Sequence, residues 1–498
     1  MSERNWVFLS GVAVILATVL TVGCGSNSGT VADSNSPVAT PSGSVVTFGT
    51  DAPICDVESF VATITSAGLV PQGGGTAVSL VTSATPATVD FARLTDFTNI
   101  LNTASVAPGT YSQLQMSLTN PQLTAINTSI SPPSPVTIAT TLTATNLTIA
   151  INPPLVVSSS TTTGITMDFN LRKSLQVDGN GQVTGTVDPH ITVTPNTLSG
   201  TTVGEADSLY GIVGTPSTTG LPSGFTGSFP LTVADGTGQT FTVLSNSSTV
   251  FEGDGVTSFT DLQPDTFVEV DAIVNTSGQI IAQTVDAEEQ TSPSSRRAAF
   301  LGKIIAVTRD GGASGNATSF TLLVDDEIPS LNGSVPLHSG LTVTLTTSTH
   351  YFTNWQHWNR QAFTLTPMTL GVAEKVAVFG VLGSGSPPTM TADNVFLRPR
   401  NVMGNFNTLQ AAGSDGTTGG FTMTPCGALF GGQPITVITY SDTNFTGASG
   451  LVNLTPAPTL NTRGDLFYEQ TSGTSKQGAS WTAPTWVLQA RQVHQLPN

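Results

Sequence analysis

The sequence has little charge, and positive charge is the scarcer sign. Only 9% of its 498 residues are charged, and 15 Lys and Arg stand against 32 Asp and Glu, for a net charge of -17. A face that binds nucleic-acid phosphates needs clustered Lys and Arg, which so few cations over this length do not supply. We therefore set nucleic acid aside as a partner.

Cysteine and the charged helix formers are scarce as well. Long helices usually contain much Glu, Lys and Arg, whereas most polar residues here are Thr, Ser, Asn and Gln. Three Cys are too few for a disulfide framework, and 38% hydrophobic residues suffice for a core. The composition predicts an all-β extracytoplasmic protein of three or four domains, at roughly 100–200 residues each. It indicates no reaction.

Residues 1–24 have the pattern of an export signal, with Arg4 before an apolar run from Trp6 to Val22. The small residue before Cys24 resembles the bacterial lipoprotein signal, in which this Cys carries the lipid. The usual Leu three residues before the Cys is absent, because Leu20 stands one place early. A signal cleaved elsewhere and a short membrane anchor are the alternatives. We expect lipidation at Cys24, which would attach the protein to the bacterial cell envelope, at its outer membrane.

Residues 25–43 are rich in Ser, Gly and Asn and predict a flexible tether. With Cys24 assigned to the lipid, Cys55 and Cys426 are the remaining cysteines. An exported protein permits a disulfide between them. The interpretation that we favour is two isolated buried thiols.

Residues 44–200 predict a β-sandwich domain. Apolar residues alternate with polar or small ones, as in Phe60, Ala62 and Ile64, which is typical of strands with one buried face. The stretch Thr95 to Ala104 departs from this pattern, because its apolar residues have helical spacing, and it predicts a short helix.

Several marks of this domain occur in a fixed order: Asp51-Ala52-Pro53, the strand from Val57 to Ile64, Pro108 to Tyr111, Met167 to Val177, and Asp188 to Pro195. Together they resemble an uncharacterised family of bacterial surface lipoprotein domains. The resemblance implies a sandwich-like β module of unknown function and brings no catalytic residues.

Two of these marks have a physical interpretation of their own. We expect Tyr111 to anchor a strand with its ring buried and its hydroxyl hydrogen-bonded. Asp51 fits turn chemistry; the alternative makes Asp51 and Asp56 cation ligands.

The remaining residues contain three copies of a motif with a period of about 90–100 residues. Each copy has a Gly after two apolar residues, then an aromatic strand end, then a Leu-led segment, and last an Ala-containing strand. The openings contain Gly211, Gly302 and Gly404; the strand ends are Thr249 to Phe251, His350 to Phe352 and Thr443 to Phe445; the Leu-led segments begin at Leu262, Leu370 and Leu460; the closing strands begin at Ala282, Ala392 and Leu488.

This order resembles a second uncharacterised bacterial family, of small β-barrel modules akin to the OB architecture. The resemblance implies three tandem modules at 208–291, 298–400 and 401–498, the last of them divergent. Closed barrels suit exported β modules because closure removes exposed edges. We expect separate beads, with protease-sensitive linkers near 196–207 and 292–297.

Motifs for chemistry are absent: the sequence has no nucleophile elbow, zinc-binding helix motif, phosphate loop or dinucleotide fingerprint. His350 and His357 are too far apart for a typical zinc pair. The acidic stretches 252–255 and 324–327 fit solvated turns, with calcium binding as the alternative. We expect no cofactor, no metal and no catalytic residues.

One aromatic segment is a candidate contact site. It contains Trp355, Trp358 and Arg360 and is inserted relative to the first copy. Such side chains suit a glycan or a protein partner. The alternative, which we favour, is that both Trp side chains fill a barrel end or a contact between modules.

The sequence therefore predicts a non-enzymatic surface lipoprotein with a binding, adhesive or scaffolding role. The alternative is an exported polysaccharide-binding accessory protein or a hydrolase, for which two carboxylates would have to meet in a groove.

Overall fold

The computed structural model describes most of the chain beyond the first 41 residues: 42–50, 57–94, 98–178, 183–197, 199–233, 239–253, 255–289, 297–328, 335–353, 363–385, 387–454 and 458–496. Residues from Pro41 to Asn498 form one compact unit. The fold is almost entirely β, as the composition predicts. Within the described ranges, no helix has the length and apolarity needed to cross a membrane.

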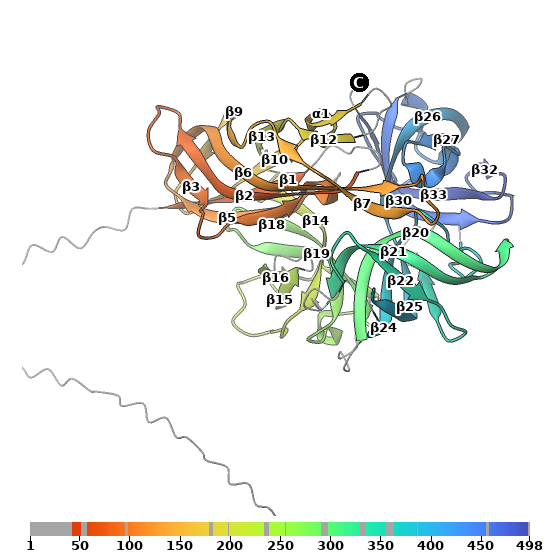
Figure 1. The fold of residues 1–498 in the computed structure, drawn as a ribbon. Coiled ribbons are helices and arrows are strands. Elements are labelled where there is room, and N and C mark those ends of the chain that lie inside the picture. The colour runs from red at the N-terminus through yellow and green to blue at the C-terminus, as the bar shows by residue number, and fades with distance from the viewer. Residues whose placement is uncertain are drawn as a thin grey trace, which may run out of the picture. The chain divides into compact units, whose positions relative to one another are not determined.

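The first part is a β-sandwich, which we call the sandwich domain (Figure 1). Its largest sheet has the order β3-β2-β6-β9-β13-β10-β1-β5, with β4 beside β2 and β7 beside β6. A smaller sheet has the order β11-β12-β8. The elements are β1 (Gly43–Thr50), β2 (Val57–Pro71), β3 (Val78–Val81), β4 (Ala87–Asp90), the 3-10 helix η1 (Phe91–Leu94), β5 (Asn99–Val106), β6 (Gly109–Asn127), β7 (Ser134–Ile138), β8 (Thr141–Leu142), β9 (Asn146–Val157), β10 (Thr162–Phe169), α1 (Leu171–Ser174), β11 (Leu175–Val177), β12 (Val183–Val187) and β13 (Ile191–Pro195).

The core of this domain follows the predicted alternation. Phe60, Ala62 and Ile64 are buried on one face of β2, and the Phe60 ring lies 5.3 Å from that of Phe169. Tyr111 is the predicted anchor: its side chain is buried and its hydroxyl donates a hydrogen bond to the Ala107 carbonyl at 2.7 Å.

The predicted short helix at Thr95 to Ala104 is wrong for its described part. Residues from Asn99 on form β5, which pairs with β1. Ile100 packs with the first module, and its neighbour Leu101 packs on the sandwich core. A strand with both faces covered produces adjacent apolar residues, and this pattern resembles helical spacing.

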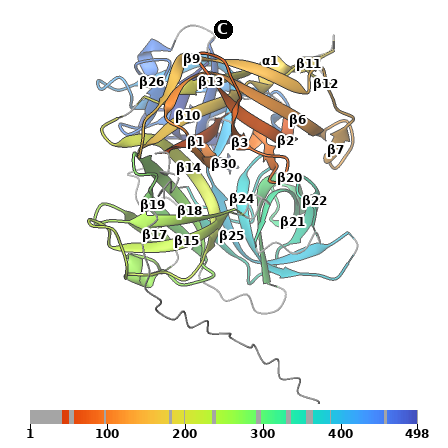
Figure 2. The ribbon, with the colours of Figure 1, turned by 90° about the vertical axis from the view of Figure 1, so that its left-hand side faces the viewer.

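Three small barrels of identical topology follow, as the repeat predicts (Figures 1 and 2). In each, the first, second, third, sixth and fifth strands form a closed ring, and the fourth lies beside the sixth. The third and sixth strands pair in parallel, as the last closure of an OB barrel requires. Module 1 has β14 (Thr202–Val213), β15 (Gly227–Val233), β16 (Thr240–Ser245), β17 (Val250–Gly253), β18 (Phe267–Asn275) and β19 (Ile280–Glu289), with η2 (Phe259–Asp261).

The other two barrels have the same order. Module 2 has β20 (Arg297–Ala313), β21 (Ala317–Ile328), β22 (Gly340–Thr344), β23 (His350–Thr353), β24 (Lys375–Leu382) and β25 (Thr389–Arg398); module 3 has β26 (Arg400–Ala412), β27 (Gly419–Pro425), β28 (Ile435–Thr439), β29 (Asn444–Thr446), β30 (Thr459–Glu469) and β33 (Thr485–Gln495), with η3 (Ala428–Phe430), η4 (Leu451–Asn453) and the short pair β31 (Gly473–Thr474) and β32 (Ser480–Trp481).

The repeated Gly of each opening has a steric cause. A Cβ at Gly211, Gly302 or Gly404 would lie 2.5, 1.9 or 2.4 Å from a carbonyl oxygen of the next strand. No side chain fits at those distances, so the Gly permits the first two strands of each barrel to approach.

A repeated Thr hydrogen bond joins the aromatic strand end of each copy to its Ala-containing closing strand. Thr249, Thr349 and Thr443 each donate a hydrogen bond, at 2.8–2.9 Å, to the carbonyl of Ala282, Ala392 and Ala490 respectively. This equivalence corrects our alignment of the second copy by one residue, because Tyr351, rather than Phe352, takes the place of Phe251 and Phe445.

The third copy also needs a correction. Leu262 and Leu454 both follow a 3-10 helix directly and stand five residues before the next strand. Leu454, rather than Leu460, is therefore the equivalent residue.

The modules are not the separate beads that we expected. Tyr210 and Phe267 of module 1 share an apolar cluster with Leu301 and Phe379 of module 2. Part of the expected linker 196–207 is strand, because β14 begins at Thr202 and pairs with β18. Its small residues, such as Gly204 and Ala206, gave a weak apolar pattern. Residues 291–296 lie outside the described part.

Candidate functional site

The sandwich domain and the three modules together line a cavity of about 750 Å³, which we call the central cavity. This volume falls within the usual range for small-molecule sites, roughly 300–1,000 Å³. Its walls come from strands β2, β3, β4, β5, β14, β20, β21, β24, β26 and β30, together with η1 and the segments around His338 and Phe430.

Charged side chains are concentrated in this cavity. Arg93, Lys303, Lys375 and Arg400 line it, which is four of the 15 Lys and Arg of the whole chain. Carboxylates lie beside them: Glu58, Asp90, Asp207 and Asp325. Buried charge is costly unless it is paired or binds something, so each of these side chains needs a partner in the protein or a ligand.

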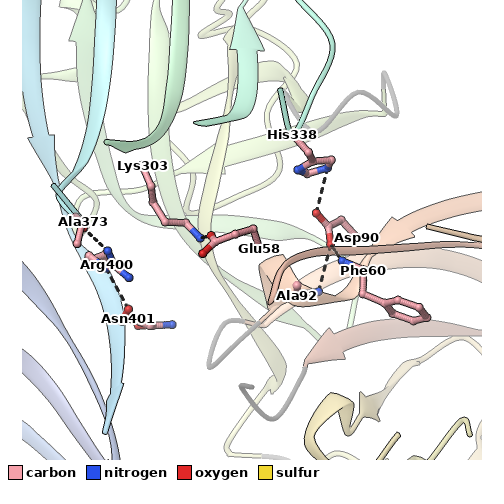
Figure 3. Close-up of polar contacts among 9 residues, drawn as sticks. All are labelled: Glu58, Phe60, Asp90, Ala92, Lys303, His338, Ala373, Arg400 and Asn401. Atoms are coloured by element: carbon pink, nitrogen blue, oxygen red, sulfur yellow. Dashed lines mark hydrogen bonds and ion pairs between the residues drawn. The ribbon is translucent and has the colours of Figure 1, made fainter. Parts of the chain in front are cut away.

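Ion pairs join the sandwich domain to module 2 around the cavity (Figure 3). Lys303 forms a salt bridge with Glu58, and Arg93 Nη2 lies 2.5 Å from Asp326 Oδ2. Burial works to lower the pKa of Lys303, but the Glu58 and Asp325 carboxylates outweigh it and raise that pKa. These pairs fix two domains relative to each other.

His338 and Asp90 form a second contact across this junction. His338 Nε2 lies 3.3 Å from Asp90 Oδ2, while Asp90 Oδ1 accepts hydrogen bonds from the backbone N–H groups of Phe60 and Ala92 (Figure 3). His338 has a φ of 60°, a conformation that non-glycine residues adopt rarely and often at functional sites.

The cavity wall from module 3 contains Arg400 and Asn461. Arg400 donates hydrogen bonds through Nη1 to the Ala373 carbonyl and through Nε to the Asn401 carbonyl, the latter at 3.2 Å (Figure 3). Asn461 is 2% exposed, and neither its Oδ1 nor its Nδ2 has a hydrogen-bond partner among the described residues. A buried carboxamide without partners is costly, and a polar ligand would supply them.

Asp207, in the wall from module 1, has an altered acidity. Burial, together with the nearby Asp271, raises its pKa to about 6. A carboxyl group with this pKa is protonated part of the time near neutral pH and can then donate a hydrogen bond.

A second set of ion pairs joins the three modules to one another. Arg398 Nη1 lies 3.6 Å from Asp286 Oδ2, which links modules 2 and 1, and Arg463 Nη2 lies 3.6 Å from Glu269 Oε1, which links modules 3 and 1. Arg398 is 2% exposed. This set holds the modules in place beside the cavity.

The residues predicted as a contact site belong to a part of the chain that the structure does not describe. Trp355, Trp358 and Arg360 lie outside the described residues, as does Cys24. Another Trp, Trp486 of module 3, has a structural role: its Nε1 donates a hydrogen bond to the Val372 carbonyl of module 2 at 2.8 Å.

The expectation of a solvated turn at 324–327 is wrong. These residues belong to β21, and Asp325 and Asp326 are 7% and 1% exposed. They are buried because Arg93 and the cavity cations face them. Among the described residues, no group of three or more His, Cys, Asp or Glu is placed to hold a metal ion.

The expectation of isolated buried thiols is also wrong. Cys426 is exposed and disulfide-bonded. The other two cysteines, Cys24 and Cys55, lie outside the described residues. Packing does not explain why an exposed position holds Cys426, whereas the disulfide does.

Comparisons with known proteins match the first domain to an uncharacterised family and add no activity. Residues 42–184 match the family described as a domain of unknown function, DUF4382. No curated protein matches the chain. A solved structure described as drosophila Unr CSD456 is similar at 11% identity over 59% of this chain and 98% of its own, with a TM-score of 0.14, and we draw nothing from it.

Proposed function

We propose that this protein is a non-enzymatic binding protein of the bacterial cell envelope, and that its central cavity holds a small polar molecule. The observation that carries the proposal is the collection of buried charge around a cavity of about 750 Å³ in a chain with only 9% charged residues. The unpartnered Asn461 side chain supports it, because such groups gain hydrogen bonds from a ligand.

Rigid junctions suit binding. Salt bridges from Glu58, Arg93 and Arg398 hold the domains that form the cavity walls. A cavity built from fixed walls loses little conformational entropy when a ligand enters.

One observation favours the alternative of an exported hydrolase. Asp207, with its pKa raised to about 6, lines the cavity together with Glu58 and Asp325. A glycosidase uses two carboxyl groups in one cleft, one of them with a raised pKa. Turnover of a cavity ligand that stops in Asp207→Asn would favour this function over simple binding.

The binding proposal is tested with the purified protein and a panel of sugars, amino acids, organic acids and phosphate esters. We expect at least one class to raise the melting temperature, and Asn461→Leu to abolish that shift because it removes the carboxamide at nearly constant volume. Asn444→Leu, an exposed change on β29, is the control. A panel without any shift, or shifts that persist in Asn461→Leu, would contradict the proposal.

The anchor is tested separately. We propose that Cys24 carries a lipid that holds the folded part at the envelope, with 25–43 as the tether. The disulfide at Cys426 supports an oxidising compartment. We expect Cys24→Ala to move the protein from the membrane fraction to the soluble fraction. Immunoblots of the two fractions measure this change. A mature N-terminus away from Cys24, measured by mass spectrometry, would contradict the lipid anchor.

A glycan or protein partner at the cell surface remains a further proposal for the segment with Trp355, Trp358 and Arg360. Its support is the residue types alone.

A further inference from the structure

Three cations lie side by side on the outer surface of module 2. Lys375 of β24 is directly opposite Lys303 of β20 on one side and Arg398 of β25 on the other. Their neighbours Ile304 and Val376 belong to the module core, so the three charged side chains extend outward. Directly opposite residues on paired strands have Cβ atoms about 4.5–5.5 Å apart, and like charges at this spacing repel.

The two outer cations, Lys303 and Arg398, have ion-pair partners, and Lys375 between them has none among the described residues. Lys303 pairs with Glu58 of the sandwich domain, and Arg398 pairs with Asp286 of module 1. The Lys375 ammonium lies 5.5 Å from the centre of the Tyr210 ring, and it forms no ion pair or hydrogen bond with the described residues. It faces the central cavity.

The barrel does not require lysines at these positions. The equivalent pair in module 1 is Ile212 opposite Phe267, and in module 3 it is Asn405 opposite Thr459. Both lysines are therefore specific to module 2 among the three modules.

Two of the cavity cations, Lys375 and Arg400, have lowered pKa values because their charges are buried. Burial lowers the pKa of Lys375, and Asp325 and Asp326 only partly oppose it; burial likewise lowers the pKa of Arg400, against Glu58 and Asp325. For both cations the cost of losing water exceeds the attraction of the nearby carboxylates. An additional negative charge would restore the balance.

We propose that the central cavity binds a small organic oxyanion, a carboxylate or a phosphate ester, whose charged group contacts Lys375 and Arg400 and whose polar remainder hydrogen-bonds to Asn461. This inference rests on the proposed binding function and names its ligand class. Arg400 uses Nη1 and Nε on backbone carbonyls, and the described residues leave its Nη2 for a ligand.

The test is isothermal titration calorimetry of the purified protein with four probes: glucuronate, glucose 6-phosphate, inorganic phosphate and glucose. Glucose is the neutral control of matched size, and the two sugar anions distinguish a carboxylate from a phosphate. We expect one or more of the anions to bind at one site and glucose not to bind. Lys375→Met should weaken that binding about 10- to 100-fold, since a hydrogen bond to a charged group is worth about 1.5–3 kcal/mol.

Controls separate the loss of an anion contact from misfolding. Lys476→Met, an exposed change outside the cavity, should leave affinity unchanged. Lys375→Gln keeps a polar side chain without charge and should lose affinity as Lys375→Met does, with a melting temperature near that of the native protein.

Three outcomes would overturn the oxyanion inference: no anion binds at millimolar concentration, glucose binds as well as the anions, or both Lys375 variants bind normally. If a neutral or cationic molecule from the wider panel binds and Asn461→Leu abolishes that binding, only the ligand class is wrong. If nothing in that panel binds, the proposed function fails with it.

Discussion

Arg398→Ala should destabilise the protein by about 3–5 kcal/mol, the usual cost of breaking a buried ion pair from one side. Arg398 is 2% exposed and lies 3.6 Å from Asp286 of module 1. Its guanidinium also lies 5.7 Å from the centre of the Phe396 ring. The substitution leaves Asp286 with a buried charge and leaves a void between two modules. Urea unfolding, followed by circular dichroism, measures the loss.

The pH dependence identifies the cause. Burial raises the pKa of Asp286 to about 6, even though Arg398 opposes the shift, so the pKa should rise further in Arg398→Ala. A carboxyl group with a raised pKa stabilises the fold fully below its unfolded pKa, and this stability is lost as the pH rises through the folded pKa. The variant should therefore lose more stability at pH 8 than at pH 5.

Two changes serve as controls for this prediction. Arg172→Ala, at an exposed position of α1, should leave the urea midpoint unchanged. The pair Arg398→Met with Asp286→Leu should recover much of the lost stability, because it also removes the buried carboxylate that faced Arg398. If Arg398→Ala has the same urea midpoint as the native protein, the ion pair contributes nothing to stability.

The sequence predicted the architecture because each signal for it is local. Alternating apolar residues such as Phe60, Ala62 and Ile64 record one buried face of a strand, whatever surrounds it. The repeated Gly302 and its equivalents record a close approach between two strands of the same barrel. Both kinds of pattern repeat within a few residues or at a fixed period.

The cavity could not be predicted in the same way. Its charged residues come from single positions on strands of four domains, for example Glu58, Asp207, Lys303 and Arg400, with no spacing that relates them. The repeat did contain one signal. When the three openings are aligned, Lys303 occupies the position of Ile212 and Asn405. A single Lys at a position that is otherwise uncharged in the repeat indicates a different environment there.

Two errors of the sequence analysis have a common cause. The segment 324–327 was interpreted as a solvated turn because acidic residues are usually exposed. The stretch before Ala104 was interpreted as helical because adjacent apolar residues rarely occur on a half-buried strand. In both cases packing between domains covers a face that the isolated domain would expose, and only tertiary contacts such as that of Arg93 with Asp326 reveal it.

Glu374→Gln should remove part of the pH dependence of stability and weaken the junction of modules 2 and 3. Glu374 is fully buried, and its two carboxylate oxygens accept hydrogen bonds from the backbone N–H groups of Gly371 and Tyr468, each at 2.9 Å. Tyr468 belongs to module 3, so this carboxylate joins two modules. An amide in its place turns an NH₂ group toward one of these N–H donors, at an expected cost of about 1–3 kcal/mol.

The sign of the pH effect follows from the raised pKa of Glu374. Burial raises the pKa of Glu374 to about 8, against the opposing effect of its two hydrogen bonds. Its contribution to stability is therefore complete below the unfolded value of 4.5 and is lost as the pH rises through about 8. Gln does not titrate, so the native protein should be more stable than Glu374→Gln at pH 5, and this difference should shrink at pH 9.

Urea midpoints at the two pH values measure this effect. Glu205→Gln, at an exposed position of β14, should unfold with the same pH dependence as the native protein. If Glu374→Gln also keeps the native pH dependence, the buried carboxyl group is not the titrating group at this junction. A native protein that becomes more stable between pH 5 and pH 9, relative to Glu374→Gln, would mean that the two backbone N–H groups outweigh burial and hold Glu374 ionised.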